Sequence, residues 1–211
     1  MLNFLPKIIP TKLVLRRDPF DSPDWLFELK HDGFRCLAYV ADGECRLVSR
    51  RRNVFKNFKP LEAALARTLK VKNAILDGEL ICMDSEGRSV FNTLIRRSST
   101  PVFYAFDLLW LNNADLRPLP LVERKRQLRK LIRRGAVHLL YATHVEGRGK
   151  DLYQAVCAQN LEGIVAKRTV GAYGKEAGWL KIKNPNYTQG EDRKELFEKY
   201  RSKRKVTGVR G

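Results

Sequence analysis

Lysines and glutamates interrupt several segments of the chain that are otherwise apolar. Lys30, Glu79 and Glu162 each stand within or beside such a segment, and Lys181 and Lys183 alternate in "WLKIK". In a strand, alternate residues point to the same face, so these two lysines would share one face. Buried charges are unfavourable unless they are paired or used in function. The set therefore indicates either buried lysine–glutamate ion pairs or a reactive site.

The stretch "FELKHDGFRC" sharpens this choice, because Lys30 lies two residues before Asp32-Gly33 and Arg35 lies two residues after it. Asp-Gly by itself predicts a hairpin corner between two strands. The alternative is a nucleophilic lysine. A lysine amine attacks only when neutral, and an ordinary lysine, with a pKa of about 10.4, is charged at pH 7. Burial near the cations Arg35, Lys181 and Lys183 would lower the pKa of Lys30.

The same group of residues suits an attack on a phosphate. The cations would stabilise the charge that grows on the phosphate, and the carboxylates of Glu79 and Glu162 could hold a divalent metal such as Mg²⁺. Gly33 lets backbone and phosphate approach closely, and the ring of Phe106 could stack on a base. These residues together predict attack by Lys30 on a nucleoside triphosphate, which leaves a lysine–nucleotide phosphoramidate.

The overall charge favours a polyanionic partner. The 211 residues include 41 basic and 23 acidic side chains, for a net charge of +18. Basic residues cluster in 46–59, in 123–134 and near the end of the chain. The second cluster has apolar residues at helical spacing, so we expect an amphipathic helix with a basic outer face. Arg124 could help to close the site, but its place in this helix favours a solvated position. The three clusters predict a nucleic-acid-binding surface.

Cysteine usage and hydropathy predict a cytoplasmic protein. The four cysteines, Cys36, Cys45, Cys82 and Cys157, show no paired or metal-finger spacing. We expect buried free thiols at three of them, Cys45 excepted, and a reducing compartment. Prolines interrupt the N-terminal segment where a signal peptide needs an apolar run, and no later segment predicts a membrane span.

The elements that must position these residues are strands and a few helices. The turn at Asp42-Gly43 predicts an antiparallel hairpin, and the pattern as a whole predicts an α+β fold of mainly antiparallel sheets flanked by helices. Helical patterns fall near 58–70, 120–134, 149–159 and 188–201. Strand-like segments cover 25–30, 35–40, 45–49, 74–83, 101–111, 138–145, 162–168 and 179–183.

In order along the chain, these motifs resemble those of the covalent nucleotidyltransferases, and within them the ATP-dependent DNA ligases. "ELKHDGFR" is similar to the first family motif, KxDGxR, which makes Lys30 the adenylated lysine. The resemblance implies that Glu28 contacts the adenine, and that Arg35 and Arg50 contact the ribose and the 5′-phosphate of the nick. It also implies the nucleotidyltransferase (ATP-grasp-like) domain of DNA ligases as the fold.

The later motifs imply the remaining roles. "DGEL" supplies Glu79 as a ribose- and metal-associated glutamate, and "FYAFDLL" supplies Phe106 as the adenine-stacking ring. "LEGIVAKR" resembles the fourth motif, with Glu162 in the metal role. "WLKIK" resembles the fifth, with Lys181 and Lys183 near the α-phosphate.

The resemblance implies an ATP-dependent DNA ligase that uses ATP with Mg²⁺ or Mn²⁺ and seals nicked or broken double-stranded DNA in repair or recombination. RNA ligases and mRNA capping enzymes share KxDG, so an RNA ligase stays an alternative. "EGIVAKR" with "WLKIKNP" is most similar to bacterial ATP-dependent DNA ligases, including the ligase modules of end-joining enzymes.

The motifs run in family order from about residue 25 to 184, and we expect residues 1–184 to form the adenylation domain. Residues 185–211 are expected to be a charged helix and tail, too short for the OB-fold domain that usually follows in the family. The chain could be a minimal monomeric ligase, a catalytic half that needs a separate OB-fold or end-joining protein, or a non-catalytic module that binds nucleotide or DNA.

Overall fold

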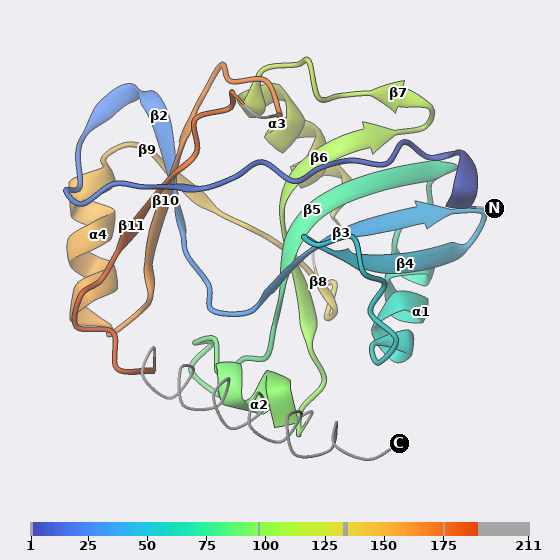
Figure 1. Cartoon of the computed structure of the whole chain (residues 1–211), viewed down its shortest axis with the longest axis horizontal. Helices are drawn as coiled ribbons and strands as arrows, with labels where there is room; N and C mark the ends of the chain where they lie inside the picture. The colour runs from blue at the N-terminus through green and yellow to red at the C-terminus, as the bar shows by residue number, and fades with distance from the viewer. Residues whose placement is uncertain (1, 97, 133–134, 175, 190–211) are drawn as a thin grey trace, which may run out of the picture.

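Two sheets that lie side by side organise the chain (Figure 1). The structure is a computed structural model, and it describes residues 2–96, 98–132, 135–174 and 176–189. The smaller sheet has the strand order β1-β11-β10-β2-β9. Its strands are β1 (Val14–Leu15), β2 (Ser22–Leu29), β9 (His144–Gly147), β10 (Gly163–Arg168) and β11 (Leu180–Lys183).

The larger sheet has the order β4-β3-β5-β6-β7, and β8 also pairs with β6. All of its pairings are antiparallel except that of β8 with β6. This mainly antiparallel α+β architecture confirms the predicted fold class. Its strands are β3 (Phe34–Ala41), β4 (Glu44–Ser49), β5 (Asn73–Ile81), β6 (Val102–Leu111), β7 (Ala114–Asp115) and β8 (Leu139–Tyr141).

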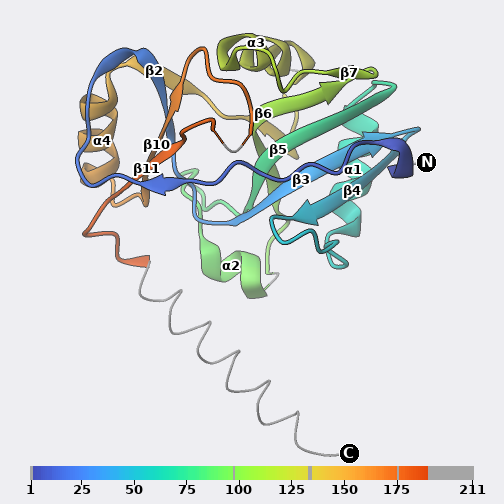
Figure 2. The ribbon, with the colours of Figure 1, turned by 45° about the horizontal axis from the view of Figure 1, so that its top comes forward.

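Helices cover the outer faces of the two sheets (Figure 2). α1 packs Leu61 and Leu65 into the core of the larger sheet, and α4 packs Val156 against the smaller sheet. The predictions near 58–70, 120–134 and 149–159 are therefore confirmed, whereas 188–201 lies almost wholly outside the described residues. The helices are η1 (Leu2–Phe4), α1 (Lys59–Thr68), α2 (Phe91–Arg96), α3 (Leu121–Leu131) and α4 (Gly149–Ala158).

The two Asp-Gly pairs behave differently. Asp42 and Gly43 have φ of 52° and 75° and join β3 to β4, so the predicted hairpin is confirmed. Asp32 and Gly33 instead lead from β2 in the smaller sheet to β3 in the larger one, so a hairpin there is wrong. A Cβ on Gly33 would lie 2.2 Å from the carbonyl oxygen of Leu80. Glycine is needed there because the backbone of β5 approaches closely.

Two further expectations need correction. The segment 138–145 is not one strand: β8 pairs with the larger sheet, and β9 pairs with the smaller one. In α3 the expected basic outer face does not include Arg124 or Lys125, both of which are buried. All four cysteines are free, although Cys157 is only half-buried. Among the described residues, no helix has the length and apolar character that a membrane crossing requires.

Candidate active site

Cross-strand register gathers the charged residues of the smaller sheet on one face. Glu28 pairs with Val165, and Val165 pairs with Lys181 on the next strand. Directly opposed residues of antiparallel strands share a face, so these three side chains form one row. Lys30 extends the next row, because its backbone N–H donates to the carbonyl of Gly163 over 2.9 Å. Lys183 pairs with Gly163 in that row.

Gly163 makes this second row possible. Its φ is 147°, and an added Cβ would lie 2.2 Å from the carbonyl oxygen of Ile182. Only glycine adopts this conformation without strain and accepts so close a strand. The glycine after Glu162 thus lets β10 begin directly beside Lys30.

The larger sheet supplies the opposite wall. Arg35 pairs with Glu79, and Glu79 pairs with Tyr104, which places a cation, a carboxyl group and a ring in one row. The register then shifts: Gly78 pairs with Ala105, but Asp77 pairs with Asp107, so Phe106 has no partner on β5. This is a β-bulge, which re-aims a side chain and is frequent beside active sites. It turns Phe106 toward the smaller sheet, where its ring lines the pocket.

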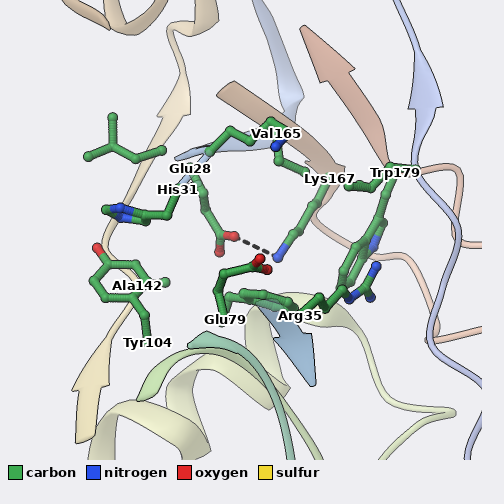
Figure 3. Close-up of a pocket in the computed structure, with 13 residues that line it drawn as sticks. Glu28, His31, Arg35, Glu79, Tyr104, Ala142, Val165, Lys167 and Trp179 are labelled. Atoms are coloured by element: carbon green, nitrogen blue, oxygen red, sulfur yellow. Dashed lines mark ion pairs between the residues drawn. The ribbon is translucent and has the colours of Figure 1, made fainter. Parts of the chain in front are cut away.

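A pocket of about 480 Å³, partly open to solvent, lies between the two walls. Figure 3 shows the carboxylates of Glu28 and Glu79 directed toward the side chain of Lys167 in the middle of the pocket. The rings of Phe106 and Trp179, with centroids 5.9 Å apart, form an aromatic corner. The pocket is lined by Leu13, Glu28, Leu29, Lys30, His31, Arg35, Glu79, Tyr104, Phe106, Ala142, Val165, Lys167 and Trp179.

Lys30 stands at the border of this pocket and a second one, which it shares with Glu162. Its Nζ lies 2.5 Å from Oε1 of Glu162. The other carboxylate oxygen, Oε2, is buried and accepts no hydrogen bond from the described residues. Glu162 therefore has an open coordination position beside the amine that the sequence marks as the nucleophile.

Arg35 is held rigidly from behind. Its guanidinium group donates to both oxygens of Asp77 over 3.1 and 2.7 Å, and to the carbonyl of Thr11 over 2.6 Å. The hydroxyl of Tyr173 also donates to Asp77 over 2.6 Å. The fully buried Asp77 is thus satisfied on both oxygens, and it fixes the direction from which Arg35 faces the pocket.

Glu28 is buried between two lysines. Lys125 of α3 donates to Oε1, and the Nζ of Lys167 lies 2.6 Å from Oε2. Burial alone would raise the pKa of Glu28, but the two lysine charges outweigh this and lower it. Glu28 therefore presents a carboxylate to the pocket, a group that only accepts hydrogen bonds.

Glu79 is the contrasting carboxyl group. Burial raises its pKa to about 8, although Lys30 and Arg35 act in the opposite direction. The described residues contain no cluster of three or more potential ligands for a metal ion. Mg²⁺ commonly takes only one or two protein carboxylates together with substrate phosphates and water. The open Oε2 of Glu162, with Glu79 on the facing wall, fits that donor set.

The structure brings most of the predicted site residues together. Glu28, Lys30, Arg35, Glu79 and Phe106 line the pocket, and Glu162 adjoins it through Lys30. Three of the predicted residues line none of the described pockets: Arg50, Lys181 and Lys183. Burial and then the charges of Lys183, Lys30 and Arg50 lower the pKa of Lys181, so these three cations lie within electrostatic reach of Lys181.

Several pocket residues were not predicted. Lys167 and Trp179 belong to "EGIVAKR" and "WLKIK", so their motifs were a signal that could have found them. The Nζ of Lys167 lies 4.3 Å from the ring centroid of Phe106 and 4.0 Å from that of Trp179. The sequence also did not indicate Lys125, which lies outside the pocket lining and donates to Glu28, because its surroundings in the sequence are those of a solvated basic helix.

Comparison with known proteins assigns this arrangement to a family. The sequence profile of the "ATP dependent DNA ligase domain" matches residues 14–183. The multifunctional non-homologous end joining protein LigD of Pseudomonas aeruginosa is 34% identical over 188 residues, which are 85% of this chain and 22% of that protein. The prophage-derived DNA ligase-like protein LigB of Bacillus subtilis is 28% identical, over 86% of this chain and 69% of that protein.

Solved structures agree with this result. A mycobacterial DNA ligase D complexed with ATP and MES aligns with a TM-score of 0.73 and 29% identity, over 82% of this chain and 59% of that one. The ligase domain of Mycobacterium tuberculosis LigD aligns with the same score and 28% identity, over 82% of this chain and 58% of that one. The chain spans about a fifth of the length of the LigD proteins of Pseudomonas and the mycobacteria. The profile match over most of the chain places it in the ATP-dependent DNA ligase family.

Proposed function

We propose that the chain carries out the nucleotidyl-transfer chemistry of a DNA ligase: Lys30 takes AMP from ATP and passes it to a 5′-phosphate of DNA. The observation that carries this proposal is the position of Lys30. Its amine is held by Glu162 at the edge of a pocket whose opposite wall offers an aromatic ring and a second carboxylate. The family match supports ATP as the nucleotide.

The pocket orients the nucleotide from base to phosphate. The adenine would stack on Phe106, with Val165 on the other wall and the Glu28 carboxylate at one edge of the base. Lys30 follows the last residue of β2 and lies two residues after Glu28 on the same side of the extended chain, so a base beside Glu28 leaves its phosphates near Lys30. Arg35, fixed by Asp77, faces the sugar and phosphate side of the pocket.

The first step forms a bond between Nζ of Lys30 and the α-phosphorus and breaks the bond from that phosphorus to the bridging oxygen. Pyrophosphate leaves. The ammonium group of Lys30 must lose a proton for this attack, and Oε1 of Glu162, at 2.5 Å, is placed to accept it. Lys181 and Lys183 extend from the same face and would stabilise the charge on the α-phosphate.

A divalent metal would be held by Glu162 and Glu79 together with phosphate oxygens. When bound, Mg²⁺ or Mn²⁺ supplies Lewis-acid stabilisation of phosphate charge. Binding it requires Glu79 to be ionised, and a nearby cation would favour the charged form over the neutral one.

In the second step a 5′-phosphate oxygen of DNA attacks the α-phosphorus and releases Lys30. In the third step a 3′-hydroxyl attacks the activated 5′-phosphate and releases AMP. The exposed Arg50 lies on the loop after β4, in the basic cluster 46–59, where it can meet the phosphate backbone. Double-stranded DNA is the proposed substrate, and an OB-fold or end-joining protein is a proposed partner.

Adenylation of the pure chain tests the first step. The chain is incubated with Mg²⁺ and ATP labelled at the α-phosphate, denatured, and analysed for covalently bound label. We expect label on the unchanged chain and none on Lys30→Ala, because no other amine occupies its position. Lys70→Met, which removes an exposed lysine after α1, is the matched control and should keep the label.

Pre-adenylated nicked DNA separates the remaining alternatives. A chain that takes no label but seals this substrate lacks only the first step and needs a partner for it. A chain that does neither is a binding module, and the proposed function is then wrong. Parallel nicks in RNA distinguish a DNA ligase from an RNA ligase. Sealing that survives Lys30→Ala with ordinary nicked DNA would exclude the proposed mechanism.

A further inference from the structure

Helix α3 reaches the base end of the pocket through a buried lysine that the proposed mechanism does not yet use. Lys125 is 1% exposed, although it lies in a sequence cluster of basic residues. Its Nζ donates to Glu28, to the carbonyl oxygen of Ala142 over 3.0 Å and to that of Phe106 over 3.5 Å. One amine thus connects β2, β6 and the segment after β8.

The two lysines that hold Glu28 differ in how their donors are used. An ammonium group has three N–H donors, and Lys125 directs all three to acceptors. Lys167 is paired with Glu28 at 2.6 Å, but it has no hydrogen bond of good geometry to any described residue. It borders the cavity, between the rings of Phe106 and Trp179. Lys125 is therefore the more firmly held of the two lysines.

Because Lys125 lies behind the pocket and not in its lining, it would act on a nucleotide through Glu28. It holds Oε1 from outside the pocket lining, and Oε2 pairs with Lys167, which lines the cavity (Figure 3). The lowered pKa of Glu28 agrees with this, since the charge of Lys125 is the largest of the influences that lower it. A carboxylate fixed in this way presents only acceptors.

We propose that Lys125 is a positioning residue for base selection: by fixing the Glu28 carboxylate, it makes the pocket accept a purine with an amino group at position 6 and reject one with a carbonyl oxygen there. The proposal deepens the proposed function and rests on it for the place of the base. Adenine brings an N–H donor to the carboxylate. Guanine and hypoxanthine bring an acceptor, which meets a fixed negative charge and is left unpaired.

The neighbouring Arg124 shows what a purely structural residue of α3 looks like. Its guanidinium group pairs with Asp107 and donates to the carbonyl oxygens of Leu119 and Gly171, and it does not line the pocket. Lys125 alone of the two holds a side chain that the nucleotide would touch.

Nucleotide binding by the full chain tests the proposal without the covalent step. The fluorescence of Trp179, which lines the pocket, reports titrations with ATP and with GTP. For Lys125→Met we expect the preference for ATP over GTP to fall about tenfold or more, mainly through weaker ATP binding. Lys125→Arg keeps the charge and should restore part of the preference, and Lys70→Met should leave it unchanged.

The rate of adduct formation at saturating ATP gives a second readout. It should stay within about threefold in Lys125→Met, because a base contact present in both ground and transition states changes affinity and not the chemical step. A merely structural role would lower the rate and weaken both nucleotides equally, which would overturn the proposal.

The double variant Glu28→Gln/Lys125→Met keeps the test valid if Lys125→Met folds poorly, because it removes both charges. Its preference for ATP over GTP should be no weaker than that of Glu28→Gln alone, since Lys125 acts through Glu28. A further loss of preference in the double variant would refute this coupling. If the unchanged chain binds ATP over GTP but neither takes label nor seals pre-adenylated nicked DNA, the proposed function fails and this inference stands. If it binds neither nucleotide, both fail.

Discussion

The two walls of the pocket hold their charges in different ways. On the larger sheet Asp77 is bonded to Arg35 and Tyr173, and the buried Asp107 is bonded on both oxygens by Arg124. On the smaller sheet Glu162 has one bonded oxygen and one open oxygen, and the amine of Lys167 lacks good acceptors.

This difference distinguishes charged groups that are fully paired within the protein from charged groups that are still available to a ligand. A buried ion pair whose partners are all satisfied has nothing left to offer a ligand, and its loss is felt as instability. A buried group with an open position costs free energy in the empty protein, and a ligand that fills the position recovers it. The satisfied pair Asp107–Arg124 is therefore expected to respond to mutation through stability, and Glu162, with its open oxygen, through activity.

Breaking the satisfied Asp107–Arg124 pair should have the largest effect on the free energy of unfolding. Asp107→Asn leaves the guanidinium group of Arg124, which has no exposed surface, without its counter-charge. We expect the free energy of unfolding to fall by about 3–5 kcal/mol, measured by urea denaturation. Arg88→Ala, which removes an exposed ion pair, is the control and should leave the unfolding midpoint unchanged. If Asp107→Asn is as stable as the control, the assignment of this pair as structural is wrong.

Changing Glu162, which has the open oxygen, should lower activity strongly and change stability little. Glu162→Gln keeps an oxygen that can accept from Lys30 but removes the negative charge and the oxygen that we propose binds the metal. We expect formation of the labelled adduct to slow by about 100-fold or more. The free energy of unfolding should change by less than about 1 kcal/mol, because the surrounding hydrogen bonds can persist. If Glu162→Gln forms the adduct as fast as the unchanged chain but is strongly destabilised, Glu162 is a structural residue and this prediction is wrong.

A smaller effect is expected from the pH dependence of His31, which lies between the two walls. Burial and then the charge of Lys30 lower the pKa of His31 to about 4, from 6.5. Between these values the unfolded chain binds more protons, so the contribution of His31 to stability is present above pH 6.5 and is lost as the pH falls toward 4. Allowing for partial exposure, we expect a loss of about 1–2 kcal/mol over that window.

Urea denaturation at several pH values between 4 and 7 measures this slope. His31→Gln removes the titrating group, so the variant should lose less stability than the parent over the same range. Equal slopes for the two proteins would show that His31 does not titrate differently in the folded and unfolded states.

Much of the fold could be predicted because local chemistry and tertiary structure agree. The Asp42-Gly43 turn forms as expected, since both residues adopt the positive φ that a tight hairpin demands. Glu79 and Phe106 face the pocket from predicted strands. The split of 138–145 between two sheets could not be predicted, because an apolar run carries no information about which strand edge it will join.

The sequence by itself determined the chemistry-bearing set: Lys30 beside Asp-Gly, the two glutamates in apolar strands, and their order along the chain. Residue type and spacing are local properties, so they can be read directly. Only the tertiary structure decided which charged residues contact the pocket and which only stabilise the fold. Lys125 and Arg124 have the same neighbours in sequence, but one holds a carboxylate of the pocket and the other a structural aspartate. That distinction depends on which strands pack beneath α3, and periodicity along the helix does not encode it.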